Sequence, residues 1–206
     1  MSPSDMGREG DRRLMLRVRD GSREAFSEIV DRFEGRLVTY FFRQCGDRSF
    51  AEDCAQEVFV RLYRSRERYG PQSRFSTFLF TIARNYWIDV TRARKVRPRE
   101  SSLNVVRDDD ETDWAGAIAG TEPEPMRALE RSEDVHRLRK ALDRLPAGQK
   151  DVVLLGVIEA MPYADVAEVL GIPVGTVKSR VHAAVQSLRG LLGSSEPSHE
   201  SPSKGE

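Results

Sequence analysis

The chain carries, from Tyr163 to Arg189, the sequence YADVAEVLGIPVGTVKSRVHAAVQSLR, and this stretch decides the fold of its C-terminal part. Apolar residues between Val166 and Leu170 predict a short first helix. Gly171 suits a left-handed C-cap after that helix, and Pro173 suits the first turn of a second one. The stretch therefore predicts two helices joined by a tight turn.

The second predicted helix has two different sides. The apolar residues recur at helical spacing and predict a buried stripe, namely Val174, Val177, Val181, Ala184, Leu188 and Leu191. The opposite side, near the helix start, presents Thr176, Lys178, Ser179, Arg180 and His182. In a helix-turn-helix, this part of the second helix meets base edges and phosphates. We therefore expect DNA binding; the alternative is an ordinary helical hairpin with a solvated basic side.

The composition argues against several classes of protein. No apolar run approaches the roughly 18 residues of a membrane span. The N-terminus, MSPSDMGREGDRR, lacks the apolar core of a signal peptide, so a soluble, cytoplasmic protein without membrane insertion is expected. The two cysteines, Cys45 and Cys54, are interpreted as reduced core side chains, with pairing or redox sensing as the alternative. Three scattered histidines without a Cys-x-x-Cys motif predict no metal site, and no cofactor is expected.

The net charge of zero hides a strong local asymmetry. Basic residues dominate from Arg61 to Arg99, where only Glu67 and Asp89 oppose them. Acidic residues dominate from Glu100 to Pro125. A basic block followed by an acidic one is typical of a polyanion-binding surface beside an acidic connector. Because the acidic stretch is also rich in Ser, Gly, Thr and Pro, we expect residues 98–125 to be an interdomain linker.

Helical periodicity also marks the N-terminal part. Ser22 can cap a helix whose apolar residues repeat at three and four positions up to Phe41. A second helix is expected over about Phe50–Tyr69. One side of it gathers Glu52, Asp53, Gln56 and Glu57. Carboxylates favour the first turn of any helix, so this side has an ordinary explanation besides partner binding.

A third helix is expected after a cap at Ser76. Its core stripe consists of Phe78, Leu79, Ile82, Ala83, Tyr86 and Val90. Another side interleaves aromatic and basic residues, namely Phe80, Arg84, Trp87, Thr91 and Arg94. Aromatic rings stack on unpaired bases while cations follow the backbone, so this side predicts single-strand binding; core packing of Phe80 and Trp87 explains it equally well. The preceding loop, Tyr69–Phe75, contains Gly70-Pro71, a pair that interrupts helical structure and favours a turn. This loop could hold one extruded base.

The order of these segments resembles the extracytoplasmic-function (group IV) sigma factors of bacterial RNA polymerase. The matching pieces of the N-terminal part are AFSEIVDRF (Ala25–Phe33), AEDCAQEVFVRLYR (Ala51–Arg64) and FSTFLFTIARNYWIDVTRARK (Phe75–Lys95). The matching piece of the C-terminal part is LPAGQKDVVLLGVIEAMPYADVAEVLGIPVGTVKSRVH (Leu145–His182). The resemblance implies an all-α protein with two small helical domains, region 2 and region 4, joined by a flexible acidic linker.

The resemblance also implies roles for particular residues. Docking on the β′ clamp helices of core RNA polymerase would fall to Asp53, Gln56 and Glu57, and the β flap is a further contact on the polymerase. Binding of the single-stranded −10 element would fall to Tyr69, Arg74, Phe75, Phe80, Arg84, Asn85, Trp87 and Arg92. Reading of the duplex −35 element would fall to Thr176, Lys178, Ser179, Arg180 and His182. The family also allows an anti-sigma factor as a partner.

Three departures from the family pattern bear on promoter binding. Phe78 stands where the family often has Trp, so melting is expected to depend more on other aromatic residues. Ala183-Ala184-Val185 stands where Arg-Ala-Arg is common. Two phosphate-contacting cations are therefore missing, and weaker −35 affinity or an altered preference is expected. Pro162 replaces the usual serine cap before the helix-turn-helix, so that helix start loses a side-chain acceptor.

Together these observations predict the following division of the chain: a disordered N-terminus over 1–10, region 2 over 11–97, the linker over 98–125, region 4 over 126–193 and a disordered tail over 194–206. The expected function is to bind core RNA polymerase, direct it to a subset of promoters and promote strand opening. No Walker loop or nucleophile–base motif occurs, so an enzyme is not expected. The alternatives are a stand-alone helix-turn-helix regulator and a polymerase-binding helical adaptor.

Overall fold

The computed structural model describes residues 3–70, 72–96 and 137–193, and over these ranges it contains helices and no strand. The helices are α1 (Pro3–Arg19), α2 (Arg23–Cys45), α3 (Arg48–Arg64), α4 (Phe75–Val96), α6 (Ala147–Val153), α7 (Tyr163–Leu170) and α8 (Val174–Gly193), with a short 3₁₀ turn η1 (Arg66–Arg68) and a π-helical turn η2 (Leu154–Ile158). Residues 137–143 are also helical. The expected all-α fold is confirmed. The predicted linker over 98–125 and tail over 194–206 lie outside the described residues.

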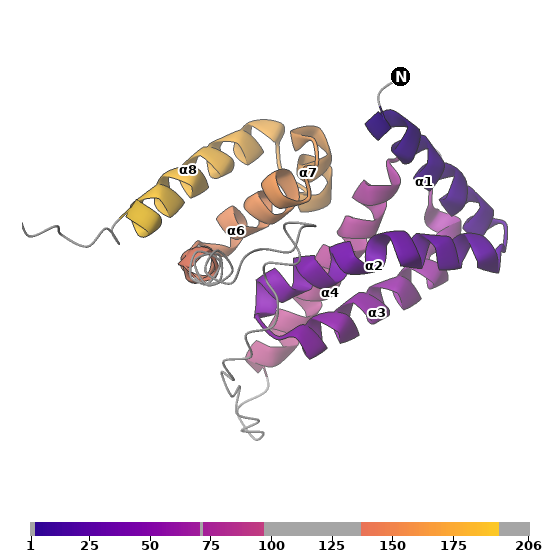
Figure 1. Ribbon diagram of the computed structural model, residues 1–206, viewed down its shortest axis with the longest axis horizontal. Helices are drawn as coiled ribbons and strands as arrows, with labels where there is room; N and C mark the ends of the chain where they lie inside the picture. The colour runs from indigo at the N-terminus through magenta and orange to yellow at the C-terminus, as the bar shows by residue number, and fades with distance from the viewer. Residues whose placement is uncertain (1–2, 71, 97–136, 194–206) are drawn as a thin grey trace, which may run out of the picture.

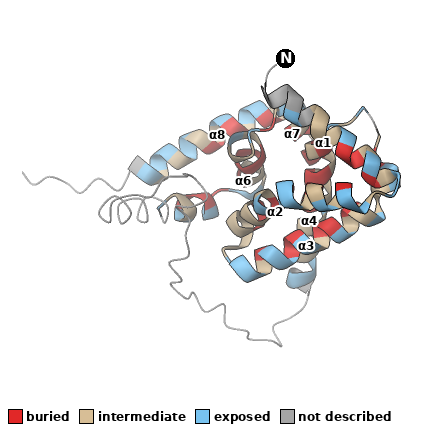
Figure 2. Ribbon diagram, turned by 45° about the vertical axis from the view of Figure 1, so that its right-hand side comes forward, coloured by how far each residue is buried: buried red, intermediate tan, exposed pale blue. Residues whose placement is uncertain are grey.

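Helices α1 to α4 form the N-terminal domain (Figure 1). Helix α2 packs against both α1 and α3, and α4 packs against α3 and α1. The buried side of α2 consists of Ala25, Ile29, Phe33, Leu37, Tyr40 and Phe41. The buried side of α3 consists of Ala51, Cys54, Ala55, Val58, Phe59 and Leu62. Both sets repeat at three and four positions, so the periodicity of the sequence correctly predicts which sides face the core (Figure 2).

Local capping explains where two of these helices begin. The hydroxyl oxygen of Ser22 accepts a hydrogen bond from the backbone N–H of Ala25 at 3.2 Å, so α2 begins where the sequence predicts. The carboxylate of Asp47 accepts from the backbone N–H of Phe50 at 2.9 Å. This cap lets α3 begin slightly earlier than expected.

Three predicted boundaries are wrong. Helix α3 ends at Arg64, short of its expected end, because the chain tightens into η1. Helix α4 begins at Phe75, so Ser76 lies in its first turn and is not its cap. Helix α1 begins at Pro3, although residues 1–10 were expected to be disordered. Helix α1 packs on α2 through the buried side chains of Leu14, Met15 and Val18.

Helices α6 to α8 form the C-terminal domain, in which α7 and α8 make the predicted helix-turn-helix. Gly171 ends α7 in the left-handed conformation, with φ 63° and ψ 37°, which a side chain would disfavour. Pro162 provides no side-chain cap for α7, as predicted. The buried side of α8 consists of Val177, Val181 and Ala184. Val174, expected to be buried, is 39% exposed because it lies at the very start of α8, beside the turn.

Between η2 and α7, Ala160 has φ 49° and is the non-glycine residue with positive φ in the described ranges. This conformation costs a residue with a Cβ roughly 1–2 kcal/mol, which glycine avoids. We expect Ala160→Gly to raise the free energy of unfolding by about 0.5 kcal/mol, after the entropy cost of glycine is subtracted. Ala164→Gly, at an exposed position of α7, should instead lower it by about 1 kcal/mol. Urea unfolding followed by circular dichroism measures both free energies of unfolding. An equal loss of stability in Ala160→Gly and Ala164→Gly would contradict the prediction.

Candidate nucleic-acid and partner interfaces

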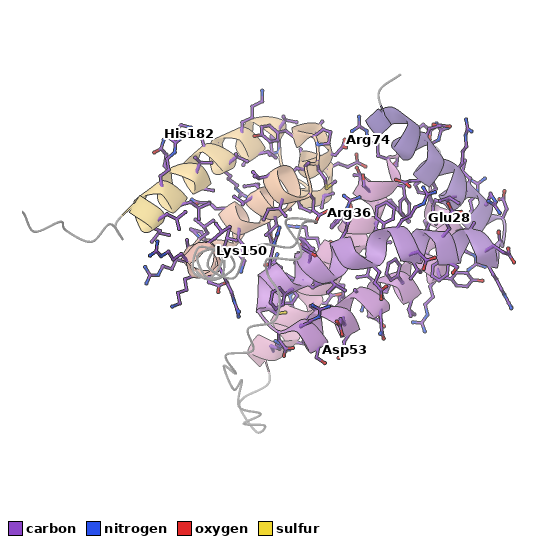
Figure 3. The ribbon with its side chains drawn as sticks, in the orientation of Figure 1. Glu28, Arg36, Asp53, Arg74, Lys150 and His182 are labelled. Carbon is purple, nitrogen blue, oxygen red and sulfur yellow. The ribbon has the colours of Figure 1, made fainter. Side chains whose placement is uncertain are left out.

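The N-terminal part of α8 presents the side that the sequence predicts to read duplex DNA. The side chains of Lys178, Ser179 and His182 are exposed. Figure 3 shows His182 on the outer side of α8, away from the N-terminal domain. Thr176 is half-buried, and its carbonyl oxygen accepts a hydrogen bond from the hydroxyl of Ser179 at 3.1 Å. The structure therefore gathers a cation, a hydroxyl and an imidazole on one accessible side, which we call the recognition side of α8 (Lys178, Ser179, His182).

Arg180 does not share this accessible side. It is half-buried, and its guanidinium lies over the start of α6. A methyl group at position 148 would lie 2.9 Å from Nη1 of Arg180. Gly148 has no side chain, so the guanidinium can occupy this space. In this arrangement Arg180 packs within the C-terminal domain, whereas the sequence predicted a contact with DNA.

The acidic side of α3 lies at the surface of the N-terminal domain. Asp53 and Gln56 are exposed, and Figure 3 shows Asp53 at the outer edge of α3. Glu57 is half-buried and accepts a hydrogen bond from Nε of Arg61 at 2.9 Å. Val60, one helical turn beyond Gln56, is 42% exposed, and the sequence analysis missed it although an apolar residue in a polar stripe is a usable signal. We call Asp53, Gln56, Glu57 and Val60 the docking side of α3.

The aromatic ends of the loop before α4 are part of the core. Tyr69 is only 2% exposed, and its hydroxyl donates to the carbonyl oxygen of Ser73 at 2.9 Å. The ring of Tyr69 packs against Phe78 with centroids 5.3 Å apart. Phe75 packs edge-on against Phe33, with centroids 4.9 Å apart. Both ends therefore anchor the loop, and neither ring is free to stack on a base in this arrangement.

Core packing also explains the aromatic residues of α4. Phe80 is fully buried, with its ring centroid 5.6 Å from that of Tyr40. Trp87 is half-buried, with its ring centroid 6.1 Å from that of Phe41. Arg84 is half-buried, and its Nε is buried without a hydrogen-bond partner among the described residues. The residues predicted to bind the −10 element that are exposed here are Arg74, Asn85 and Arg92.

The two domains contact each other, which the sequence analysis did not predict, and Arg74, predicted to bind the −10 element, takes part in the contact. Helix α4 packs on α7, and one continuous cluster of buried apolar residues extends from the N-terminal into the C-terminal domain. Nε of Arg36 donates to Glu159 at 2.9 Å. Nη1 of Arg74 donates to Asp165 at 2.8 Å. These partners lie far apart in the chain, so no local sequence pattern could have revealed them.

Both cysteines are free thiols. Burial raises the pKa of Cys54 to about 11 and also raises the pKa of Cys45. Because the thiolate is the reactive form, we expect Cys54 to react with Ellman's reagent at pH 8 only after unfolding in urea, and Cys45 to react more slowly than free cysteine. Reaction of Cys54 in the folded chain should rise as the pH approaches the raised pKa. Immediate reaction of both thiols at pH 8 would contradict their interpretation as core side chains.

Two features are absent from the described part of the chain. There, no three His, Cys, Asp or Glu side chains are grouped so that they could hold a metal ion. No helix there has both the length and the apolar character needed to cross a membrane.

Comparison with known proteins identifies the two domains. Residues 29–97 match the family Sigma-70 region 2, and residues 136–188 match the family Sigma-70, region 4. The chain is 32% identical over 183 residues to the ECF RNA polymerase sigma factor SigW of Bacillus subtilis (strain 168), covering 88% of this chain and 96% of that protein. It is 31% identical over 181 residues to the RNA polymerase sigma-H factor of Pseudomonas aeruginosa, covering 87% of this chain and 92% of that protein.

Solved structures share the same helical fold. The structure of CnrH in complex with the cytosolic domain of CnrY matches with a TM-score of 0.66 at 23% identity, covering 91% of this chain and 99% of that one. The sigma factor RpoE in complex with the anti-sigma factor NepR from Bartonella quintana matches with a TM-score of 0.61 at 24% identity. The match covers 83% of this chain and 98% of that one. A region 2 domain followed by a region 4 domain defines a promoter-recognising sigma factor of RNA polymerase. Within that class, the chain belongs to the extracytoplasmic-function (ECF) group of the sigma-70 family.

Proposed function

We propose that the two domains divide the work of promoter recognition. The C-terminal domain reads the duplex −35 element with the recognition side of α8. The N-terminal domain binds core polymerase with the docking side of α3 and holds the melted −10 strand. The observation that carries this proposal is the exposure of Lys178, Ser179 and His182 near the start of the second helix of a helix-turn-helix, where such a helix enters the major groove.

For the −10 strand, we propose that the exposed polar residues make the contacts. The guanidinium groups of Arg74 and Arg92 suit phosphate oxygens, and the amide of Asn85 offers both donors and an acceptor to a base edge. The buried rings of Tyr69 and Phe75 are positioning groups in this proposal, since they anchor the loop. This revises the expectation that those rings stack on the base directly.

We also propose that the −35 contact is weak. At positions 183–185, where the family pattern carries two arginines, this chain has Ala183, Ala184 and Val185. Ala184 is buried, and its two neighbours are half-buried against the domain core. None of them supplies a cation to phosphate, and phosphate neutralisation dominates DNA affinity. Specificity would then depend on Lys178, His182 and cooperation with the −10 contact.

Further roles follow from the family and are proposals for this chain. CnrH and RpoE were each solved with a bound protein, the cytosolic domain of CnrY and the anti-sigma factor NepR. Their likeness supports an anti-sigma factor as a partner here. The polymerase, and not this chain, would supply the phosphodiester chemistry. The place of action would be the cytoplasm, where bacterial polymerase and DNA meet.

Co-elution with purified core RNA polymerase on a sizing column tests this function. The proposal predicts a complex that forms without DNA and then binds promoter fragments. A stand-alone helix-turn-helix regulator would bind DNA and elute separately from the polymerase. That outcome would contradict the proposal and would leave the match of residues 29–97 to Sigma-70 region 2 unexplained.

A further inference from the structure

Arg180 lies on a different side of α8 from the recognition side. Residues two positions apart on an α-helix are turned away from each other by about 200°, and Arg180 is two positions from both Lys178 and His182. It is three positions from Val177 and four from Ala184, which are both buried. Arg180 therefore flanks the buried side of α8, whereas Lys178 and His182 share the exposed recognition side.

The guanidinium of Arg180 fills the space that a glycine leaves open at the start of α6. A Cβ atom at Gly148 would lie 2.9 Å from Nη1, 3.2 Å from Cζ and 3.7 Å from Nε of Arg180, and these are its three nearest neighbours. Helices α6 and α8 also pack through apolar side chains further along, where Val153 and Ala184 belong to one buried cluster (Figure 1). Arg180 adds a second, separate point of contact between the two helices.

A carboxylate on α6 helps to hold Arg180 in this place. Asp151 lies three positions after Gly148, so the two residues share one side of α6. Burial raises the pKa of Asp151, and the positive charge of Arg180 is one of the influences that oppose this rise. A half-buried cation is attracted more strongly to a partly desolvated carboxylate than it would be in water. The charge of Arg180 is therefore engaged within the C-terminal domain.

The first half of α8 has few cations with which to align itself on DNA. Between Val174 and Leu188 the sequence contains one lysine and one arginine, Lys178 and Arg180. Because Arg180 packs on α6, Lys178 is the one of these two that the recognition side presents. Contacts to phosphate fix the orientation of a protein on the duplex, so a helix with few of them depends more on its own domain to set its direction.

We propose that Arg180 is a positioning residue for −35 recognition: its guanidinium, seated on Gly148, braces α8 against α6 and fixes the angle at which the recognition side enters the major groove. Arg180 makes no phosphate contact in this role. Gly148 belongs to the same device, because a side chain there would displace the guanidinium. The inference rests on the proposed function, since it takes the recognition side of α8 to read the −35 duplex.

Gly148→Ala tests the brace without removing a charge. Its methyl group meets the flexible end of Arg180, so the guanidinium can move aside while the helices stay folded. Alanine favours a helix over glycine, so the urea midpoint of the full chain should not fall. The affinity of the holoenzyme for a short duplex should nevertheless fall about fivefold, because binding groups must be held within narrow limits of angle and distance. The duplex carries the −35 element of a promoter that the holoenzyme selects from genomic fragments.

The matched control is Gly190→Ala. Gly190 lies on α8 near its end, and a Cβ atom there would meet no described atom within 4 Å. The same exchange of glycine for alanine should therefore leave the affinity for the −35 duplex within about twofold of the parental value. Equal affinities of Gly148→Ala and Gly190→Ala would overturn the proposed brace.

The salt dependence of binding separates positioning from phosphate contact. Losing one phosphate contact reduces the slope of log affinity against log salt concentration by about one. We expect this reduction for Lys178→Ala, whereas Arg180→Ala should weaken binding about fivefold with the parental slope. Arg180→Lys keeps the charge and loses the flat guanidinium, so it should bind as weakly as Arg180→Ala. A slope reduced by one in Arg180→Ala, or parental affinity in Arg180→Lys, would overturn the inference.

The double variant of Gly148→Ala with Arg180→Ala shows whether the two residues act as one unit. Its affinity should equal that of either single variant, and losses that multiply would overturn the inference. Urea unfolding measures the same coupling without DNA: Gly148→Ala should raise the midpoint more when Arg180 is already Ala, because no guanidinium has to move. Equal midpoint shifts in both backgrounds would also overturn the brace. Failure to form a promoter-selecting holoenzyme would instead refute the proposed function and leave the unfolding result standing.

Discussion

Replacing Asp53 with Lys is expected to weaken assembly with core RNA polymerase by ten- to a hundredfold, roughly 1.4–2.7 kcal/mol. Asp53 is exposed on the docking side of α3, so its carboxylate is available to a basic partner surface. Like charges brought together at an interface cost several kcal/mol. The helix itself should be unaffected, because Asp53 points away from the core. Titration of labelled core polymerase with each variant measures the change.

The control for this prediction is Glu34→Lys. Glu34 is also exposed and carries the same charge, but it lies on α2, outside the docking side of α3. Assembly should then stay within about twofold of the parent, as for most surface contacts outside an interface. Adding Glu57→Lys to Asp53→Lys should deepen the loss, although Glu57 also pairs with Arg61 and its reversal disturbs that pair. Equal effects of Asp53→Lys and Glu34→Lys would contradict the proposed docking side.

Replacing Asn85 with Ala should reduce open promoter complexes at least about tenfold while leaving polymerase binding unchanged, because extruding a base costs a few kcal/mol that its contacts must offset. Asn85 is exposed on α4, so truncation leaves the core intact. Its amide can both donate to and accept from a Watson–Crick edge. Permanganate footprinting of the −10 region, with holoenzyme formed in excess, measures the opened fraction.

Two comparisons sharpen the prediction for Asn85. Asp31→Ala truncates another exposed polar side chain, on α2, and should open promoters as the parent does. Tyr69→Phe removes only the hydrogen bond from the Tyr69 hydroxyl to Ser73 and keeps the ring that anchors the loop. Its effect should be smaller than that of Asn85→Ala if Tyr69 positions the loop and does not touch the base. Full promoter opening by Asn85→Ala would place the base contact elsewhere.

Features set by a few neighbouring residues could be predicted from the sequence. Ser22 begins α2 and Gly171 ends α7 as expected, because capping and left-handed conformation depend on one side chain and its adjacent backbone. The helix-turn-helix and its exposed Lys178 follow from the same local rules. Apolar periodicity predicted the buried sides of α2 and α3 for the same reason.

Features set by distant contacts could not be predicted in this way. The sequence pattern of an aromatic residue beside arginines is the same in a strand-binding surface and in a core. Phe80 belongs to the core, because Tyr40 and Arg36 pack on its ring. The guanidinium of Arg180 likewise lies beside Gly148 of α6. The sequence of α8 alone gives no sign of this contact. The contact between α4 and α7 joins residues that are far apart in the chain and belong to different domains, so it forms only once both domains are folded.

Transcription in vitro tests the central claim, that this chain directs RNA polymerase to promoters through its two domains, most directly. Core polymerase is incubated with the chain and fragmented genomic DNA of its own organism, and the 5′ ends of the transcripts are mapped. We predict start sites that appear only with the chain, share two short upstream motifs at a constant spacing, and disappear with Asp53→Lys. Start sites identical to those of core polymerase alone, or sites without a shared pair of upstream motifs, would contradict the account.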